Sequence, residues 1–231
     1  MQNLIQVAGI KDRREAQMLL KIGVDWLGFP FRLPVHKEDI SEAAAAAIIA
    51  SLEPPHAGVL ITYLADPREI LQLCQKLGTG KVQLHGEIAL SQLHQLKEIA
   101  PQLFVIKSLI VKPGNFAHLR SQVKQFGSLV DAFITDTHDP RTGADGATGK
   151  THDWSVSRRL VAISSRPIIL AGGLNPANVR SAILQVRPAG VDVHTGVEDA
   201  SGRKDARKAA AFVAEARAAF TLAGSSEWAS R

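Results

Sequence analysis

Short runs of aliphatic residues alternate along the chain with amphipathic stretches of about a dozen residues. This alternation is typical of βαβ units, because buried parallel strands are apolar on both faces and helices cover them. The pattern repeats eight times. The expected strands are residues 4–10, 25–31, 57–64, 81–85, 103–111, 131–136, 167–171 and 190–194.

Local signals mark several of the intervening helices. A capping side chain followed by proline, at 66–67 and again at 175–176, predicts that a helix begins there. Gly23, Gly78 and Gly127 stand where helices are expected to end, because glycine tolerates the left-handed conformation that terminates a helix.

Chain length decides how the units assemble. Eight βα pairs in 231 residues fit one closed (β/α)8 TIM barrel of the α/β class, since such barrels occupy about 250 residues. We expect the barrel to span residues 1–222, followed by a C-terminal tail at 223–231. An open, doubly wound sheet is the alternative.

Composition limits the partners and the compartment. The formal net charge of +5 suits an anionic ligand, but the basic residues are spread over the helices, so nucleic acid is not expected as a partner. A single cysteine, Cys74, excludes an internal disulfide, and no motif implies a metal or an organic cofactor. No segment resembles a signal peptide or a membrane span. We expect a cytoplasmic monomer or homodimer that does not contact membranes.

Two glycine-containing turns follow the last two expected strands. Gly172 and Gly173 precede a helix start, and Thr195 and Gly196 form the second turn. Such turns let backbone amides approach a phosphate, and barrels frequently bind phosphate between the loops after strands seven and eight. The pattern predicts a ligand that carries a phosphate group. Alternatively, the glycines only permit tight turns.

Seven segments together resemble one known family, the phosphoribosylanthranilate isomerases. They are QVAGI (6–10), AGVL (57–60), VQLHG (82–86), FITD (133–136), TGKTHDW (148–154), ILAGGLNP (169–176) and GVDVHTGVE (190–198). The resemblance runs nearly end to end. It implies an aldose–ketose type isomerase that performs an Amadori rearrangement in tryptophan biosynthesis.

The resemblance also implies roles for single residues. Asp136 matches the family's general acid, which protonates the sugar ring oxygen, although an aspartate there can also cap a turn. His85 matches a substrate-contacting histidine or is structural. Gly149 belongs to a loop that closes over the ligand, and Asp192 matches a carboxylate near the floor of the site or forms an internal salt bridge.

The first strand departs from the family pattern. The family reads Lys-x-Cys-Gly-Ile, with cysteine as general base, where this chain has Gln6 and Ala8. A methyl group cannot accept a proton, and Cys74 lies on an expected outer helix, so it cannot substitute. Because both groups are lost together, divergence explains them better than a single inactivating change. Arg32 or Lys37 is a candidate for the family's cationic residue after the second strand.

His194 stands where the family has serine, and it shares a strand face with Asp192. Because strands eight and one are neighbours in a closed barrel, His194 can project toward Ala8. We hypothesise that His194 or His85 supplies the missing base. The alternatives are a diverged enzyme acting on another sugar phosphate, or a noncatalytic protein that binds a phosphoribosyl ligand.

Overall fold

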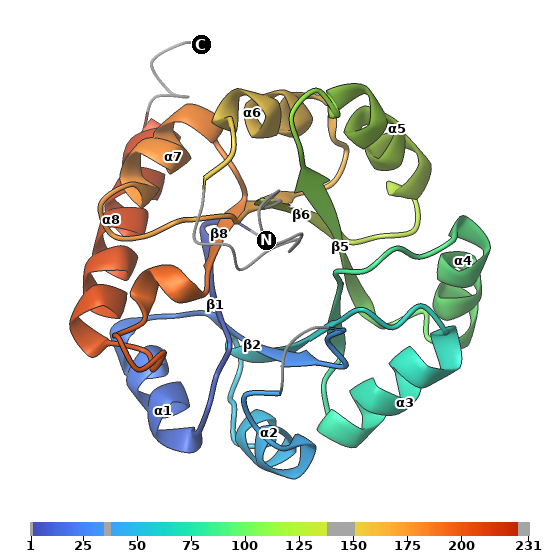
Figure 1. The fold of residues 1–231 in the computed structure, drawn as a ribbon, viewed down its shortest axis with the longest axis horizontal. Coiled ribbons are helices and arrows are strands. Elements are labelled where there is room, and N and C mark those ends of the chain that lie inside the picture. The colour runs from blue at the N-terminus through green and yellow to red at the C-terminus, as the bar shows by residue number, and fades with distance from the viewer. Residues whose placement is uncertain (1, 35–37, 138–150, 226–231) are drawn as a thin grey trace.

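The computed structural model describes residues 2–34, 38–137 and 151–225, and within them eight parallel strands close into a barrel in the ring order β1 to β8 (Figure 1). This confirms the expected (β/α)8 TIM barrel. The strands are β1 (Leu4–Ala8), β2 (Trp26–Phe31), β3 (Ala57–Thr62), β4 (Lys81–Leu84), β5 (Phe104–Val111), β6 (Ala132–Thr137), β7 (Ile168–Leu170) and β8 (Gly190–Val193).

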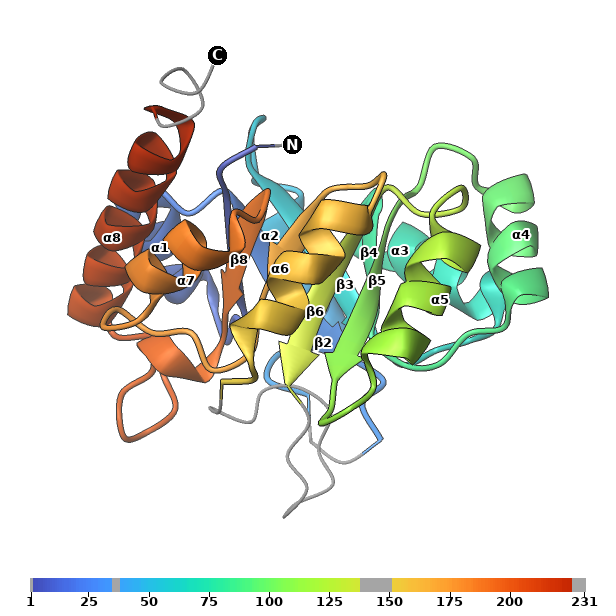
Figure 2. The same ribbon diagram turned by 90° about the horizontal axis from the view of Figure 1, so that it is seen from above.

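A ring of helices surrounds the barrel (Figure 1), and the side view of Figure 2 shows the arrowheads of β5 and β6 pointing to the end that carries the loop after β8. The helices are α1 (Arg13–Ile22), α2 (Glu42–Ile49), α3 (Pro67–Leu77), α4 (Leu90–Ile99), α5 (Phe116–Phe126), α6 (Trp154–Ile163), α7 (Val179–Val186) and α8 (Ala206–Ser225), with a short 3-10 helix η1 (Thr195–Val197).

The two proline-marked helix starts differ. Helix α3 begins as expected, with Asp66 Oδ1 accepting from the backbone N–H groups of Arg68 and Glu69. The expected start of α7 at residue 175 was wrong. Residues 175–178 form a turn in which Asn178 Oδ1 accepts a hydrogen bond from the N–H of Asn175 at 2.8 Å. The helix begins after this turn, at Val179.

Helices end at all three expected glycines, but the left-handed conformation holds at only two of them. Gly23 (φ 100°) and Gly78 (φ 69°) are left-handed C-caps. Gly127 ends α5 but has φ −56°, so the left-handed conformation expected there was wrong. Helix α8 continues to Ser225, beyond the expected boundary at 222, and residues 226–231 of the expected tail lie outside the described residues.

Alternation along the strands separates two cores. Strand residues that face outward, such as Phe29 and Phe133, pack against helix residues such as Phe212 of α8, and all three are completely buried. Residues that face inward form a second, smaller cluster inside the barrel: Leu4, Ala8, Trp26, Val59, Ile61, Ile106, Ala132, Ile134, Ile169 and Ala171. Two polar inward residues, Asp136 at the end of β6 and Asp192 on β8, lie toward the carboxyl ends of the strands, which places the candidate site there.

Candidate active site

A layer of polar side chains crosses the barrel interior. Gln6 lies between the inward-facing Leu4 and Ala8 on β1, and its Nε2 donates to Gln83 Oε1 of β4 at 3.0 Å. The register pairs Gln6 with Asp192 of β8. All three polar residues, Gln6, Gln83 and Asp192, are buried. They form the floor beneath the open end of the barrel.

Asp192, which belongs to this floor, interacts electrostatically with Asp136, which lies above it. Asp136, at the end of β6, is buried, and its Oδ1 accepts from the N–H of Thr137 at 2.7 Å. Burial and, next, the negative charge of Asp136 raise the pKa of Asp192 to about 7, while a hydrogen bond with Gln6 and the charge of Lys204 oppose the rise. Asp192 is therefore able to exchange a proton near neutral pH.

The turns after β7 and β8 lie side by side. A Cβ atom on Gly196 would stand 1.9 Å from the carbonyl oxygen of Leu174, so only glycine fits between the two turns. Gly172 and Gly173 have φ of 94° and 64°, and a Cβ atom on Gly172 would stand 2.1 Å from Thr137 Oγ1. The four residues chosen from the sequence, Gly172, Gly173, Thr195 and Gly196, thus come together next to the end of β6.

A hydrogen-bonded chain that the sequence did not reveal supports this region. Nδ1 of His152 lies 2.9 Å from Thr137 Oγ1, and its Nε2 lies 2.6 Å from Ser157 Oγ of α6. Burial lowers the pKa of His152 to about 4, with Asp153 opposing, so the imidazole is neutral at pH 7. The segment TGKTHDW carried the signal, but sequence reasoning singled out its Gly149 and passed over His152.

His85 lies on the far side of the barrel, because β4 is opposite β8 in the ring. It is buried, its Nδ1 lies 3.0 Å from Ser108 Oγ of β5, and its ring packs on Tyr63 at 5.0 Å between centroids. These contacts fix the orientation of the imidazole above the strand ends.

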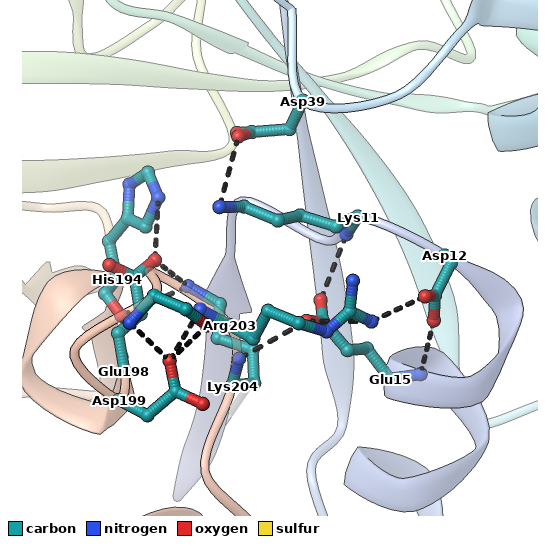
Figure 3. Close-up of polar contacts among 10 residues, drawn as sticks. Lys11, Asp12, Glu15, Asp39, His194, Glu198, Asp199, Arg203 and Lys204 are labelled. Carbon is teal, nitrogen blue, oxygen red and sulfur yellow. Dashed lines mark hydrogen bonds and ion pairs between the residues drawn. The ribbon is translucent and has the colours of Figure 1, made fainter.

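His194 directly follows β8 and lies against the end of β1. Figure 3 shows its side chain beside Glu198. Its ring contacts Gly9, the residue after Ala8, and its Nε2 is 3.4 Å from Glu198 Oε1. The same Glu198 oxygen accepts from Lys204 Nζ at 2.7 Å. The structure therefore brings His194 next to the strand that lacks the family's base and holds it beside a carboxylate.

An ion network ties the β8–α8 connection to α1 (Figure 3). The buried carboxylate of Glu15 accepts from the N–H of Lys11 at 3.0 Å and from the N–H of Lys204 at 3.1 Å. Arg203 lies 3.3 Å from Glu15 and also pairs with Asp12, the N-cap of α1. Sequence reasoning missed this network, because its members are far apart in the chain.

The remaining candidates lie elsewhere. Arg32 is exposed and pairs with Glu38 at 2.9 Å and with Glu42. Gly149 and Lys37 lie outside the described residues. Cys74 is buried in α3, where desolvation raises the pKa of its thiol to about 12, so it is remote from the site and unreactive.

Within the described ranges, no group of three or more His, Cys, Asp or Glu side chains is arranged to hold a metal ion. In the same ranges, no helix has the length and apolar character needed to cross a bilayer.

A closed (β/α)8 barrel that gathers two carboxyl groups and two apposed glycine turns at the carboxyl ends of its strands is a TIM-barrel enzyme. The family comparison makes this specific. Residues 5–215 match the family described as N-(5'phosphoribosyl)anthranilate (PRA) isomerase, and the chain belongs to that family. This confirms the resemblance drawn from the seven segments.

Individual relatives support the same family assignment. The N-(5'-phosphoribosyl)anthranilate isomerase 2 of Methanosarcina mazei is 38% identical over 218 residues, which cover 94% of this chain and 95% of the relative. The crystal structure of the Thermotoga maritima enzyme superposes with a TM-score of 0.79 at 31% identity, covering 93% and 98% of the two chains. A phosphoribosyl anthranilate isomerase bound to reduced 1-(o-carboxyphenylamino)-1-deoxyribulose 5-phosphate gives 0.77 at 29% identity, with the same coverage.

Proposed function

We propose that this protein converts N-(5'-phosphoribosyl)anthranilate to 1-(o-carboxyphenylamino)-1-deoxyribulose 5-phosphate, the Amadori rearrangement for which its relatives are named. The observation that carries the proposal is the contact between the turns after β7 and β8 beside the end of β6, where Asp136 lies. A phosphate held by these turns leaves the sugar within the ring of strand ends. The protein acts in the cytoplasm as a monomer or homodimer, without a nucleic acid partner.

The phosphate contacts come from backbone amides. Gly172 and Gly173 expose their N–H groups through positive φ, and Thr195 and Gly196 open η1 opposite them. Backbone amides at such turns bind oxyanions without a cationic side chain. Gly149 is proposed as a further contact, and Arg32 would have to exchange Glu38 or Glu42 for a carboxylate of the substrate.

Asp136 is proposed as the general acid. It protonates the ring oxygen as the C1–O bond breaks, and nearby Asp192 makes a shared proton favourable because two neighbouring carboxylates repel each other. Ala8 supplies no base, and the buried Cys74 cannot reach the site. His194 and His85 are the candidates from the sequence, and Asp192 joins them from the structure.

Turnover of the substrate tests the proposal directly. Loss of anthranilate fluorescence should follow addition of the protein, and the gene should restore growth of a tryptophan-requiring strain that lacks the isomerase. Asp136→Asn should lower kcat by about 10²- to 10⁴-fold while the protein still binds the reduced product analogue.

Ala8 favours one second candidate, a noncatalytic protein that binds a phosphoribosyl ligand. Binding of the reduced product analogue without turnover of the substrate would identify that function and refute the isomerase. Failure to bind the analogue, combined with turnover of a different sugar phosphate, would indicate a diverged barrel enzyme.

A further inference from the structure

Asp192 has an unusual position in the barrel. It lies on β8 between Val191 and Val193, which pack in the outer core, so its side chain faces the interior. The side chain is 8% exposed. Among the residues that the structure describes, its Oδ1 is buried and has no hydrogen-bond partner. A buried carboxylate oxygen without a partner is costly, which indicates that the group serves the reaction rather than the fold.

Within residues 2–34, 38–137 and 151–225, the cation that acts on Asp192 is Lys204, and its effect is the weakest of those on this carboxyl group. Gln6 is its partner in the strand register and hydrogen-bonds to it, whereas the family pattern has lysine at that position. The other charges that act on it are Asp136 of β6 and, more weakly, Lys204, which is bound to His194 O and to Glu198. A lysine at position 6 would hold the carboxyl group ionised, and glutamine does not.

The side chains one layer above Asp192 on the neighbouring strands are small. Ala8 ends β1 and Ala171 follows β7, so methyl groups line the interior on both strands next to β8, one layer toward the carboxyl ends. The family's cysteine would fill the first of these positions. With alanine there, a sugar carbon can approach the carboxyl group of Asp192.

We propose that Asp192 is the general base of this protein, taking the place of the family's cysteine. The proposal rests on the isomerase function argued above. It links the two departures on β1: loss of lysine at position 6 gives Asp192 the freedom to bind and release a proton, and loss of cysteine at position 8 gives the substrate access to it.

The proton transfers balance. Asp136 gives its proton to the ring oxygen, the C1–O bond breaks, and the nitrogen lone pair forms a C1=N bond. Ionised Asp192 then takes the proton from C2. The C2–H electron pair forms C1=C2, and the C1=N pair returns to nitrogen. The enolamine loses its 2-hydroxyl proton and gains one at C1, so no oxidant or reductant is required.

Asp192 is better placed than either histidine. His194 sits at the rim with its Nε2 beside Glu198, and His85 is bound to Ser108 on the strand opposite β8. Asp192 is on the strand that pairs with β1 and is electrostatically coupled to Asp136. The acid and the base are then neighbours, with one proton between them.

Asp192→Asn and a rescue variant test the assignment. In Asp192→Asn, kcat should fall by about 10²- to 10⁴-fold while the Kd of the reduced product analogue changes less than about threefold. Adding Ala8→Cys to that variant should restore at least about tenfold in kcat and move the acidic limb of the kcat profile toward pH 8.5, because a thiol is then the base. Loss of kcat without any recovery in the double variant would mark Asp192 as structural and overturn the proposal.

Gln6→Lys provides a test that does not depend on how Asp192→Asn folds. The added ammonium should shift the acidic limb of the kcat profile to lower pH by about one unit or more. If the acidic limb of the kcat profile did not move in Gln6→Lys, or if it disappeared only in His194→Ala or His85→Ala, Asp192 would not be the base. If the unaltered protein does not turn over the substrate at all, the isomerase function fails instead.

Discussion

A Cβ atom on Gly9 would lie 2.1 Å from Nε2 of His194, so the imidazole occupies the space that any larger residue at position 9 would need. Gly9 also has φ 76°, a conformation that L side chains rarely adopt. Residue 9 is therefore restricted twice, by its own backbone and by a side chain from the opposite end of the chain.

Gly9→Ala should cost more stability than backbone strain alone. Gly78→Ala is the matched control, because Gly78 has φ 69° and no atom within 4 Å of its Cβ position. We expect about 1 kcal/mol for the control and about 2 to 3 kcal/mol for Gly9→Ala, in urea unfolding at pH 7. Equal losses would show that the imidazole moves aside freely.

Gly196→Ala should separate the two turns proposed to bind phosphate. The new methyl group meets the backbone carbonyl of Leu174 at 1.9 Å, and backbone cannot move away as a side chain can. We expect KM for the phosphoribosyl substrate to rise by more than about tenfold, which corresponds to about 1.4 kcal/mol of binding. Gly80→Ala, with open space around its Cβ position, should leave KM unchanged. A normal KM in Gly196→Ala would place the phosphate elsewhere.

His152 should make the fold less stable in mild acid. Its pKa is about 4 in the folded protein and 6.5 as an isolated group, so the unfolded chain takes up a proton first as the pH falls. Stability from this group is present above pH 6.5 and is lost progressively down to about pH 4. Between pH 7.5 and pH 5 the loss should be about 2 kcal/mol.

His152→Phe should remove this pH dependence, although it weakens the fold at pH 7.5 by leaving Thr137 and the buried Ser157 without their partner. The stability difference between variant and unaltered protein should therefore narrow toward pH 5. Replacement of the exposed His94 by Gln should leave the slope unchanged. If the stability of His152→Phe still fell with pH as in the unaltered protein, the pH dependence would belong to other groups.

Cys74 should be inert. Because burial raises the pKa of its thiol to about 12, the native protein should not react with iodoacetamide at pH 8, and reaction should appear only with unfolding. Cys74→Ala should keep kcat within about twofold and cost about 1 kcal/mol of stability for the small cavity. Rapid alkylation of the folded protein, or a large loss of kcat, would contradict this.

The sequence predicted the barrel because its signals are local. Each buried strand is an apolar run, and the start of α3 is marked by the N-cap Asp66 and by Pro67 in the first turn. The start of α7 was misplaced for a local reason too: Asn175 and Asn178 hydrogen-bond to each other and hold a turn where proline suggested a helix.

Contacts between distant residues could not be predicted in the same way. The partners of His152 and the interaction between Asp136 and Asp192 depend on which strands become neighbours and on what burial does to a charge. The sequence placed Gly172, Gly173, Thr195 and Gly196 correctly at adjacent strand ends because ring order follows chain order. It favoured His194 as a base because strands eight and one are neighbours, whereas the effect of burial on the pKa of Asp192 has no local signal in the sequence.

The Glu15 network has a consequence for biosynthesis. Its carboxylate depends on the N–H of Lys204, 189 positions away, and on Arg203. While the ribosome is still extending the polypeptide, the Glu15 carboxylate of helix α1 has the N–H of Lys11 but not yet Arg203 or Lys204, and burying it without a cation is unfavourable. The first helix should dock among the last elements, so prematurely terminated polypeptides that stop before residue 203 should leave it undocked and open to proteases.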